Sequence, residues 1–455
     1  MSAYCLHPGS ALLRMPPQVF VWINQNMLDL VGINLPHPYL VTPSAQAPLG
    51  LLYVMQGAKK VGFNVSVFDG TGKSPSELAK EVPSSVAYGI SATVVDYPMA
   101  LSVAKCLKAK NPKCKILLGG PIHTAIDYID MTWFDSLIIG EAEEEIGNIV
   151  QDCVDNKLSR IYKCSCSNID YVHPAYGLWK GPLGGKVLAD EKYANAESSV
   201  ILTSRGCPYS CVFCCAKTLC DGKVRFRNTD FLFEEIDYLA RRGVRVLRLS
   251  DENFTTSKKH VYEFCERIRP YYEKYELVWR PSFRVDSSDL EMLKVMRASG
   301  CVEASIGIES TDQTVLDTIQ KKTTVEQGTK ALQELKEAGI FRRVLFMTGC
   351  PGTNHQTLLK NARFILDETK YDIISITVFT PLPGTPIWDN PAKFRCSILE
   401  HARRLENLCF YFFSPEGTRE IEPFISLWDF PYEDLKLEVN TTRGLIQAVG
   451  KVNKG

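Results

Sequence analysis

Short apolar runs alternate with longer amphipathic stretches over the first third of the chain. Segments of helical length and period separate the runs, and residues 48–62 place Leu51, Met55 and Ala58 on one helical face. Such alternation predicts a parallel, doubly wound α/β sheet over residues 1–157. The predicted strands are "QVFVWI" (18–23), "FNVSVFD" (63–69), "SVAYGIS" (85–91), "CKILLGG" (114–120) and "FDSLIIG" (134–140).

Periodicity fails over residues 158–198, where "HPAYGLWKGPLGG" is rich in proline, glycine and aromatic residues, and we interpret this segment as a linker. Alternation returns over residues 199–390, and six successive strand–helix units predict a partial (β/α)6 barrel with its active site at the carboxyl ends of the strands. Residues 391–455 contain "CFYFFSP" and "ISLWDFPYEDL" without a clear period, and we expect a small C-terminal extension there. The barrel strands are expected at "SVILTS" (199–204), "VRVLRLS" (244–250), "ELVWRPSFR" (276–284), "CVEASIGIE" (301–309), "RRVLFMTG" (342–349) and "DIISITVFT" (372–380).

The charge balance and the lengths of the apolar runs limit the kinds of partner expected for this protein. The 52 Lys and Arg residues balance the 52 Asp and Glu residues, so no overall field favours nucleic acid or an anionic membrane surface. No apolar run reaches the ~20 residues of a membrane span, and the first thirty residues lack the pattern of a signal peptide. We therefore expect a cytoplasmic protein. Its sixteen cysteines then indicate metal ligation or burial and not a disulfide framework.

Five cysteines crowd into the segment "CPYSCVFCCAKTLC". Cys207, Cys211 and Cys214 follow a predicted strand end at spacings that let three thiolates converge on one metal centre. Zinc is the alternative, but a closed structural zinc site needs four ligands. Three ligands leave one position open, as in a 4Fe-4S cluster that binds a small molecule. Cys215 is expected to be a packed residue, and Cys220 stays open between burial and a role on the substrate side.

This spacing, with an aromatic residue at Phe213, resembles the signature of the radical S-adenosylmethionine (SAM) superfamily. The resemblance implies that the open iron binds SAM and that an electron, from a donor such as flavodoxin or ferredoxin, cleaves it to a 5'-deoxyadenosyl radical. "RLSDENF", "PSFRVD", "SIGIES" and "MTGCPG" follow in the order expected of such a barrel. By resemblance, the SAM-binding residues are Phe213, Asp251, Arg284, Glu309, Gly349 and Pro351.

Structural interpretations of these residues remain open. Asp251 and Glu309 are alternatively interpreted as solvated acidic residues at strand ends, without a role in binding SAM. Arg284 has the alternative of pairing only with Asp286.

The ends of the later strands in the amino-terminal domain carry a second resemblance. "VWINQNML" lacks the G-x-G-x-x-G of a dinucleotide site. "GISAT", "LLGGPIHTA" and "IIGEAEEE" instead resemble the Rossmann-like cobalamin-binding domain that precedes some radical SAM barrels. The resemblance implies a pocket for the nucleotide tail of cobalamin, lined by Ser91, Thr93, Gly119, Gly120, Pro121, His123, Gly140 and Glu141.

The D-x-H-x-x-G loop that places a histidine under cobalt in other cobalamin proteins is absent, since residues 24–34 contain no histidine. His37 is expected at the surface, and His123 is expected to line the nucleotide tail. We therefore expect cobalamin to bind without its own base or a protein histidine on the metal.

Taken together, the resemblances imply an oxygen-sensitive, anaerobic enzyme of the cobalamin-dependent radical SAM family. Its expected activity is methyl transfer, in which methylcobalamin gives a methyl group to an unactivated carbon of a small molecule after the radical abstracts a hydrogen. The alternatives are a radical oxidation, cyclisation or ring rearrangement, and a sensing module that uses both cofactors. Methylthio transfer is disfavoured because Cys164 and Cys166 do not make a second cysteine trio. Substrate identity stays open.

Overall fold

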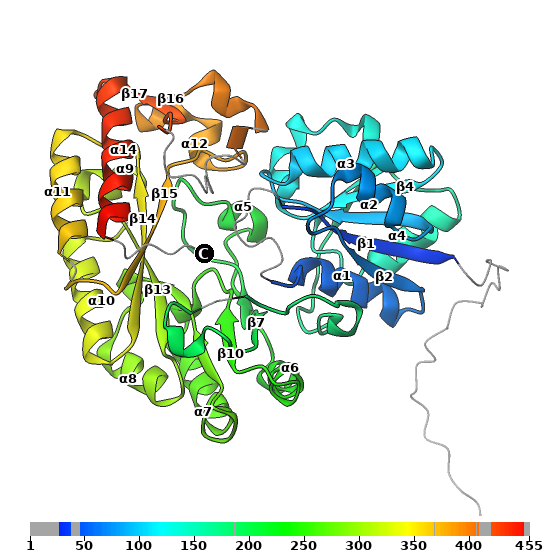
Figure 1. Cartoon of the computed structure of the whole chain (residues 1–455), viewed down its shortest axis with the longest axis horizontal. Helices are drawn as coiled ribbons and strands as arrows, with labels where there is room; N and C mark the ends of the chain where they lie inside the picture. The colour runs from blue at the N-terminus through cyan, green and yellow to red at the C-terminus, as the bar shows by residue number, and fades with distance from the viewer. Residues whose placement is uncertain are drawn as a thin grey trace, which may run out of the picture.

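The computed structural model describes residues 27–37, 46–185, 188–367, 369–405, 407–408 and 420–449. Two α/β parts lie side by side in Figure 1, with the amino-terminal part at the right. No helix within the described ranges has the length and apolar character needed to cross a bilayer.

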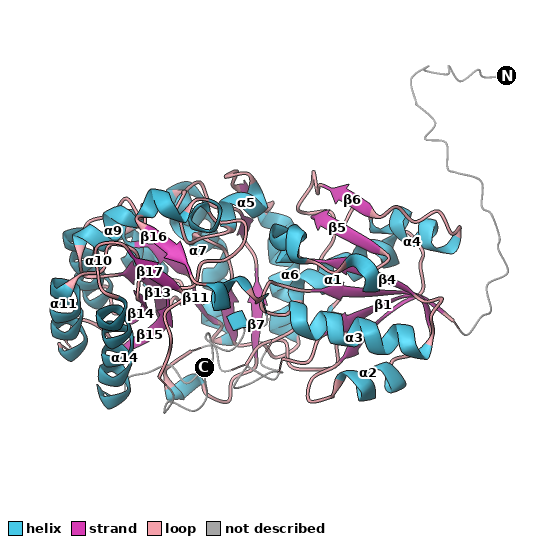
Figure 2. Cartoon of the chain, turned by 90° about the horizontal axis from the view of Figure 1, so that it is seen from above, coloured by secondary structure: helices cyan, strands magenta, loops and turns pink. Residues whose placement is uncertain are grey.

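A six-stranded parallel sheet forms the core of the amino-terminal part, in the order β2-β1-β3-β4-β5-β6. Helices α1 and α4 cover one face and α2 and α3 the other (Figure 2). The strand order reverses between β1 and β3, which is where doubly wound sheets bind ligands. The elements are β1 (Leu28–Asn34), α1 (Leu49–Lys60), β2 (Val65–Asp69), α2 (Pro75–Glu81), β3 (Ser85–Ser91), α3 (Tyr97–Lys110), β4 (Lys115–Gly119), η1 (Pro121–Tyr128), η2 (Met131–Trp133), β5 (Ser136–Gly140), α4 (Ile146–Val154) and β6 (Ile161–Cys164).

Two strands of this sheet were not predicted. β1 is central and buried, but Asp29 and Gly32 interrupt its apolar run, so its sequence does not stand out. β6 lies beyond the predicted boundary at residue 157, and its exposed edge position explains its weak apolar pattern. The predicted strand at residues 18–23 lies outside the described residues. The parallel α/β architecture is confirmed, and α1 buries its predicted face.

Parallel strands also form the wall of the second part, in the orders β11-β10-β7 and β12-β13-β14-β15. Pro281 separates β11 from β12 because it has no N–H for the ladder. A bridge between Trp279 and Cys301 joins the two sheets across this break. The strands are β7 (Ser198–Ile201), β10 (Val246–Leu249), β11 (Val278–Arg280), β12 (Ser282–Arg284), β13 (Glu303–Glu309), β14 (Phe341–Thr348) and β15 (Ile373–Val378).

Helices cover the outer side of this curved wall, and the cysteine loop with α5 lies on its inner side, towards the amino-terminal part (Figure 1). The outward side chains of the strands pack with the helices in one apolar core. The helices are α5 (Ala216–Cys220), α6 (Thr229–Arg241), η5 (Phe254–Thr256), α7 (Lys258–Tyr275), η6 (Val285–Ser287), α8 (Leu290–Ala298), α9 (Gln313–Thr318), α10 (Val325–Glu337), α11 (His355–Leu366) and α12 (Pro386–Asp389), and a short hairpin pairs β8 (Ser204–Arg205) with β9 (Arg225–Phe226).

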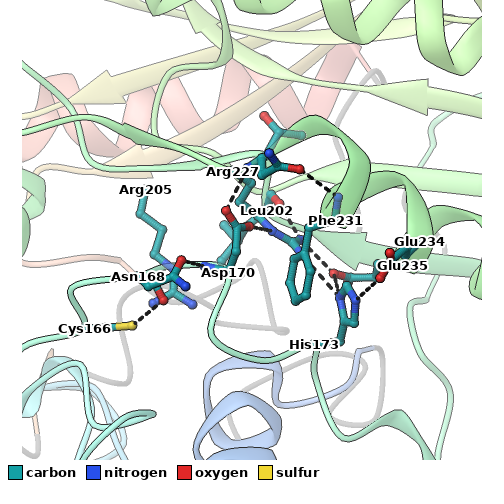
Figure 3. A network of polar contacts seen from close by, with 12 residues as sticks. Cys166, Asn168, Asp170, His173, Leu202, Arg205, Arg227, Phe231, Glu234 and Glu235 are labelled. Carbon is teal, nitrogen blue, oxygen red and sulfur yellow. Dashed lines mark hydrogen bonds and ion pairs between the residues drawn. The ribbon is translucent and has the colours of Figure 1, made fainter. Parts of the chain in front are cut away.

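Buried ion pairs fix the linker to the second part (Figure 3). Arg227 donates to Glu235 at 2.7 Å, and Asp170 of the linker accepts from the backbone N–H of Asn228 at 2.8 Å. Tyr176 donates to Glu235 at 2.6 Å. Burial favours the neutral form of Glu235, but Arg227 outweighs it and holds the pKa of that carboxyl below its ordinary value. The linker is therefore a packed structural element, with η3 (Tyr176–Leu178) and η4 (Glu191–Tyr193).

The C-terminal extension contains a long helix that was not predicted. It comprises η7 (Pro391–Phe394), β16 (Cys396–Ile398), η8 (Glu400–Arg403), β17 (Ile425–Leu427) and α14 (Tyr432–Val449). Glu438 of α14 accepts from the Thr348 hydroxyl at 2.6 Å and the Gly349 N–H at 3.0 Å. This buried carboxylate attaches α14 to the carboxyl end of β14. The aromatic segment "CFYFFSP" lies outside the described residues.

Replacing Glu438 with Ala should lower the free energy of unfolding by about 2–3 kcal/mol, because Thr348 and Gly349 lose a buried acceptor. Urea denaturation measures the change. Glu433→Ala, at an exposed position in the first turn of α14, is the matched control and should change stability by less than about 0.5 kcal/mol. Equal effects of the two changes would contradict the attachment.

Candidate functional site

The three cysteines of the signature lie in the loop between β8 and α5, at the carboxyl end of β7. Cys207, Cys211 and Cys214 are half-buried, and the Cys214 N–H donates to the Cys211 carbonyl at 3.2 Å, which closes a tight turn. Within the described ranges, no three His, Cys, Asp or Glu side chains are placed to hold one metal ion. An iron–sulfur cluster makes a different demand, because each cysteine binds a separate iron. Three cysteines in one tight loop are compatible with that demand.

Two acidic residues after β10 hold the start of this loop. Asp251 accepts from the Thr203 N–H at 2.8 Å, the Thr203 hydroxyl at 2.5 Å and the Ser204 hydroxyl at 2.6 Å. Glu252 accepts from the Gly206 N–H at 2.9 Å. Gly206 has a φ of +103°, and a Cβ there would collide with the Lys223 carbonyl, so only glycine fits. The loop is positioned by the protein itself.

Asp251 was predicted to bind SAM, and the structure places it in a buried network instead of an open cleft. Burial raises its pKa to about 6, despite the hydrogen bonds from Ser204 and Thr203. His260 Nε2 lies 2.8 Å from the Thr203 hydroxyl, and burial lowers the pKa of His260 to about 4, so the ring is neutral at pH 7. Both Asp251 oxygens are occupied, which favours a role in positioning the loop.

Arg284 lies against the cysteines. Its Nη1 is 3.3 Å from Cys211 Sγ, and the guanidinium stacks 3.8 Å from the centroid of Tyr209. Two hydrogen bonds of 3.0 Å join it to Asp286, and Nη2 donates to the Lys321 carbonyl at 2.6 Å. The alternative of an Asp286 pair is therefore present, and the same side chain also brings a positive charge to the cysteine loop.

Glu309, Lys321 and Phe213 form a row beside the cysteine loop. Lys321 Nζ donates to Glu309 at 2.5 Å and lies 5.8 Å from the Phe213 ring centroid. Glu309 has a φ of +64°, a strained conformation for a residue with a side chain, and such strain clusters at functional sites. Its side chain is buried and paired, so it is not a solvated strand-end acid.

The remaining predicted SAM residues lie in the turn after β14. The Gly349 N–H donates to Glu438, so this amide is occupied by the C-terminal helix. Pro351 is buried in the same turn. Outside the signature, Cys215 packs against the Pro383 carbonyl, in keeping with its expected role, and Cys220 is half-buried beneath Gly206.

Most of the predicted cobalamin residues surround one cavity of about 240 Å³ in the amino-terminal part, which we call the slot. Gly120 has a φ of +87°, and a Cβ there would lie 2.7 Å from Ser91 Oγ, so a side chain would distort this wall. The predicted residues that line the slot are Ser91, Gly119, Gly120, Pro121, Gly140 and Glu141.

Other slot residues were missed from the sequence. Tyr53 of α1, Glu143 and Arg205 line it, and Arg205 stacks 4.8 Å from the Tyr53 ring centroid. The Tyr53 hydroxyl and Glu143 Oε2 are buried and have no hydrogen-bond partner among the described residues. These three residues belong to no sequence motif and lie far apart in the chain, so the sequence did not indicate that they line one cavity. Tyr53 lies in the amphipathic stretch 48–62, which was predicted only as a helix.

A wider cavity of about 520 Å³ adjoins the slot, and both are lined by Gly50, Leu51, Ser91 and Leu202. Thr93 lines this second cavity and donates its hydroxyl to Asp96 at 2.6 Å. His37 lines it too, with Nδ1 3.0 Å from Asp96, so the expectation of a surface His37 was wrong.

The expectation about His37 was wrong because β1 was not predicted from the sequence. Residues 28–34 are the strand itself, so the loop after it begins at Leu35 and includes His37. His123 lies near the slot without lining it, and its Nδ1 is 3.0 Å from the Gly120 carbonyl.

Ion pairs connect the slot to the cysteine loop. Arg205 Nη1 donates to Glu141 at 3.0 Å and to Glu143 at 2.8 Å, and Arg225 donates to Glu141 at 2.7 Å. Burial of Glu141 favours its neutral form, but Arg225 and Arg205 outweigh it and lower its pKa. Arg205 precedes Cys207 by two residues. The slot wall and the cysteine loop therefore share one charged cluster.

Comparison with known proteins agrees with this geometry. Residues 201–365 match the family model of the radical SAM superfamily. The chain therefore contains a radical SAM domain. An uncharacterized methyltransferase of Pyrococcus horikoshii is 27% identical to this radical SAM chain over 371 residues, which cover 75% of the chain and 78% of that protein. The anaerobic magnesium-protoporphyrin IX monomethyl ester cyclase of Cereibacter sphaeroides is 27% identical over 378 residues, covering 75% of the chain and 60% of the cyclase.

A solved radical SAM methyltransferase has a similar fold. TsrM from Kitasatospora setae, determined with cobalamin and a [4Fe-4S] cluster bound, aligns with a TM-score of 0.64 at 16% identity, over 79% of this chain and 74% of that one. At this identity the likeness shows the α/β fold. The resemblance to cobalamin-dependent radical SAM enzymes inferred from the sequence is confirmed.

Replacing Thr203 with Val should destabilise this radical SAM protein by about 2 kcal/mol at pH 8, because ionised Asp251 loses a buried donor. The loss should shrink below pH 6, since Asp251, whose pKa is raised to about 6, is then protonated and needs the donor less. Urea denaturation at pH 5 and pH 8 measures the difference. Thr329→Val, on an exposed helix face, is the control, and a loss that does not depend on pH would contradict the proposed network.

Proposed function

We propose that this protein is a cobalamin-dependent radical SAM methyltransferase that methylates an unactivated carbon of a small molecule. The observation that carries the proposal is the Arg205 cluster, because it joins the slot wall at Glu141 and Glu143 to the segment that leads into Cys207. A methyl carrier and a radical source have to face one substrate, and the ion pairs between the two candidate sites support such an arrangement.

The cysteine loop fits a three-cysteine cluster. Cys207, Cys211 and Cys214 would hold it, and Arg284 would balance the negative charge of the thiolates. Lys321 and Glu309 lie at the same mouth and offer a cation and an anion to a zwitterion such as SAM. When bound, the cluster and SAM supply the 5'-deoxyadenosyl radical and cobalamin supplies the methyl carrier.

The slot fits part of cobalamin for two reasons. Its walls are mainly apolar, as an aromatic nucleotide base requires, and glycines leave it room. The unpartnered Tyr53 hydroxyl offers a donor, and Glu143 Oε2 offers an acceptor, to the amide groups of a polar ligand. Binding without a histidine on cobalt remains a prediction, and His37 beside Asp96 is the residue on which to test it.

The chain's own residues would orient the reactants and exclude water. Asp251 and Glu252 fix the loop that carries the cysteines, and Arg205 fixes that loop against the slot. A fixed loop costs little reorganisation when the substrate binds. A small electron donor such as flavodoxin or ferredoxin would supply the reducing equivalent from outside.

One observation favours a second candidate function. The relative in Cereibacter sphaeroides is named a cyclase and is as similar in sequence as the relative named a methyltransferase. A radical oxidation or cyclisation without methyl transfer is therefore the alternative.

The decisive experiment uses the anaerobically reconstituted, reduced full chain with SAM that carries a CD3 methyl group. It is incubated with a small-molecule extract of the cells that make the protein. Methyl transfer should give 5'-deoxyadenosine and a new metabolite that carries deuterium, measured by mass spectrometry. Cys211→Ala should abolish both products, whereas Cys215→Ala should retain deoxyadenosine formation. A product formed with deoxyadenosine but without deuterium would favour the cyclase alternative.

Replacing Gly119 with Val should lower the cobalamin bound per chain at least tenfold, because the side chain would fill part of the slot. A Cβ at Gly119 meets only Ile138, at 3.7 Å, so the fold should tolerate the change. Absorption spectroscopy of the purified chain measures bound cobalamin and iron. Gly177→Val, where a Cβ meets nothing, is the control. Full cobalamin in a folded Gly119 variant would show that the slot is not the site.

A further inference from the structure

The inner face of the curved wall is polar and partly accessible. Outward positions such as Leu249 and Phe346 are buried beneath the helices. Inward positions at the same strands are only half-buried, including Arg248 on β10, Ser250 directly after β10, and Leu345 on β14. The inner face of the wall is therefore partly accessible to solvent below the carboxyl ends of its strands.

Two arginines meet around one glutamate on this inner face, and a third arginine lies beside them on the neighbouring strand. Arg280 Nη1 donates to Glu303 Oε1 at 2.8 Å, and Arg343 Nε donates to the same oxygen at 2.6 Å. The Ala189 N–H occupies Glu303 Oε2 at 2.7 Å. Arg248 is the third arginine, and its register partner on β11 is Arg280. We call this group the arginine cluster.

The cluster carries more positive charge than its partners balance. Glu303 is the only carboxylate that pairs with it among the described residues, so one negative charge faces three positive ones. Arg343 Nη1 is buried without a hydrogen-bond partner, and no hydrogen bond reaches the Arg248 guanidinium from the described part of the chain. Burial, and then the charge of Arg343, lower the pKa of Arg248. Three positive charges held this close together with one carboxylate destabilise a fold unless a ligand neutralises the excess.

We infer that the arginine cluster binds an anionic group of the substrate, a carboxylate or a phosphate monoester, through Arg248 and Arg343. This inference rests on the proposed function and names a substrate class for the same site. Ser250 lines the wider cavity at the mouth, and Arg248 lies two residues below it on β10. At the rise of a strand this is a depth of about 7 Å. A substrate with an anionic end would thus reach into the wall while its other end stays at the mouth.

A polar group beside the cluster supports the inference. Ser375 Oγ is buried and has no hydrogen-bond partner among the described residues. Its register partner is Leu345, one inward position above Arg343. A hydroxyl and two guanidinium groups are the donors that a carboxylate or phosphate accepts from.

The direction of a stability change separates this site from a structural ion cluster. Arg248→Met removes the unbalanced charge and keeps the apolar stem, so it should raise the Tm of the ligand-free chain by about 2 °C. Arg245→Met is the matched control, since Arg245 donates to the carbonyls of Ala240 and Val244 outside the wall. It should leave the Tm unchanged or lower it.

Anion binding is measured on the reconstituted full chain by titration calorimetry in chloride-free buffer, with acetate and methyl phosphate as probes. The unmodified chain and Arg245→Met should bind at least one probe, and Arg248→Met should lose at least tenfold in affinity. Preference for acetate would assign a carboxylate, and preference for methyl phosphate would assign a phosphate monoester.

Three results would overturn the inference: no probe binding by the unmodified chain, unchanged binding by Arg248→Met, or a lower Tm for Arg248→Met than for Arg245→Met. The probes do not need radical chemistry. Lost binding in a chain that still forms deoxyadenosine therefore rejects the anion site alone, and intact binding without deoxyadenosine rejects the proposed function alone.

Discussion

The contact of Arg205 with Glu141 and Glu143 is the constraint on which the arrangement of both candidate sites depends. The Arg205 and Glu143 side chains are 11% and 7% exposed, so water screens the pair weakly. Removing one member of such a buried group leaves the other uncompensated, at a cost of about 3–5 kcal/mol. Because Arg205 leads directly into the cysteine loop, the position of that loop and the shape of the slot are not independent.

The cysteine loop is prepared by its surroundings before any cofactor binds. Carboxylates from the end of β10 hold its first turn, and Arg284 holds its middle. Such outer contacts orient ligands and tune what they bind. The positive φ of Glu309 and the buried, unpartnered Tyr53 hydroxyl each cost stability, and features of this kind cluster at functional sites.

Local signals made much of this molecule predictable from sequence. The strand β3 has the predicted bounds because its apolar run is bounded by polar turns, and the slot glycines follow strands whose ends must meet. β1 was not predicted because Asp29 breaks its apolar pattern. The loop after β1 was therefore expected too early in the chain, and His37 was not recognised as part of it. The roles of Arg205 and Arg248 depend on contacts with residues far away in the sequence, which a local sequence pattern does not reveal.

The linker network around Arg227 has a practical consequence for dissecting the chain. Arg227 and Glu235 belong to the second part by sequence, yet Asp170 of the linker pairs with Arg227 (Figure 3). Tyr176 of the linker donates a hydrogen bond to Glu235. A fragment that starts at β7 would expose this pair and lose two of its partners. Expression of the radical SAM portion alone therefore requires a fragment that begins before Asp170. A chimera that takes its amino-terminal sheet from a relative likewise requires a junction before Asp170.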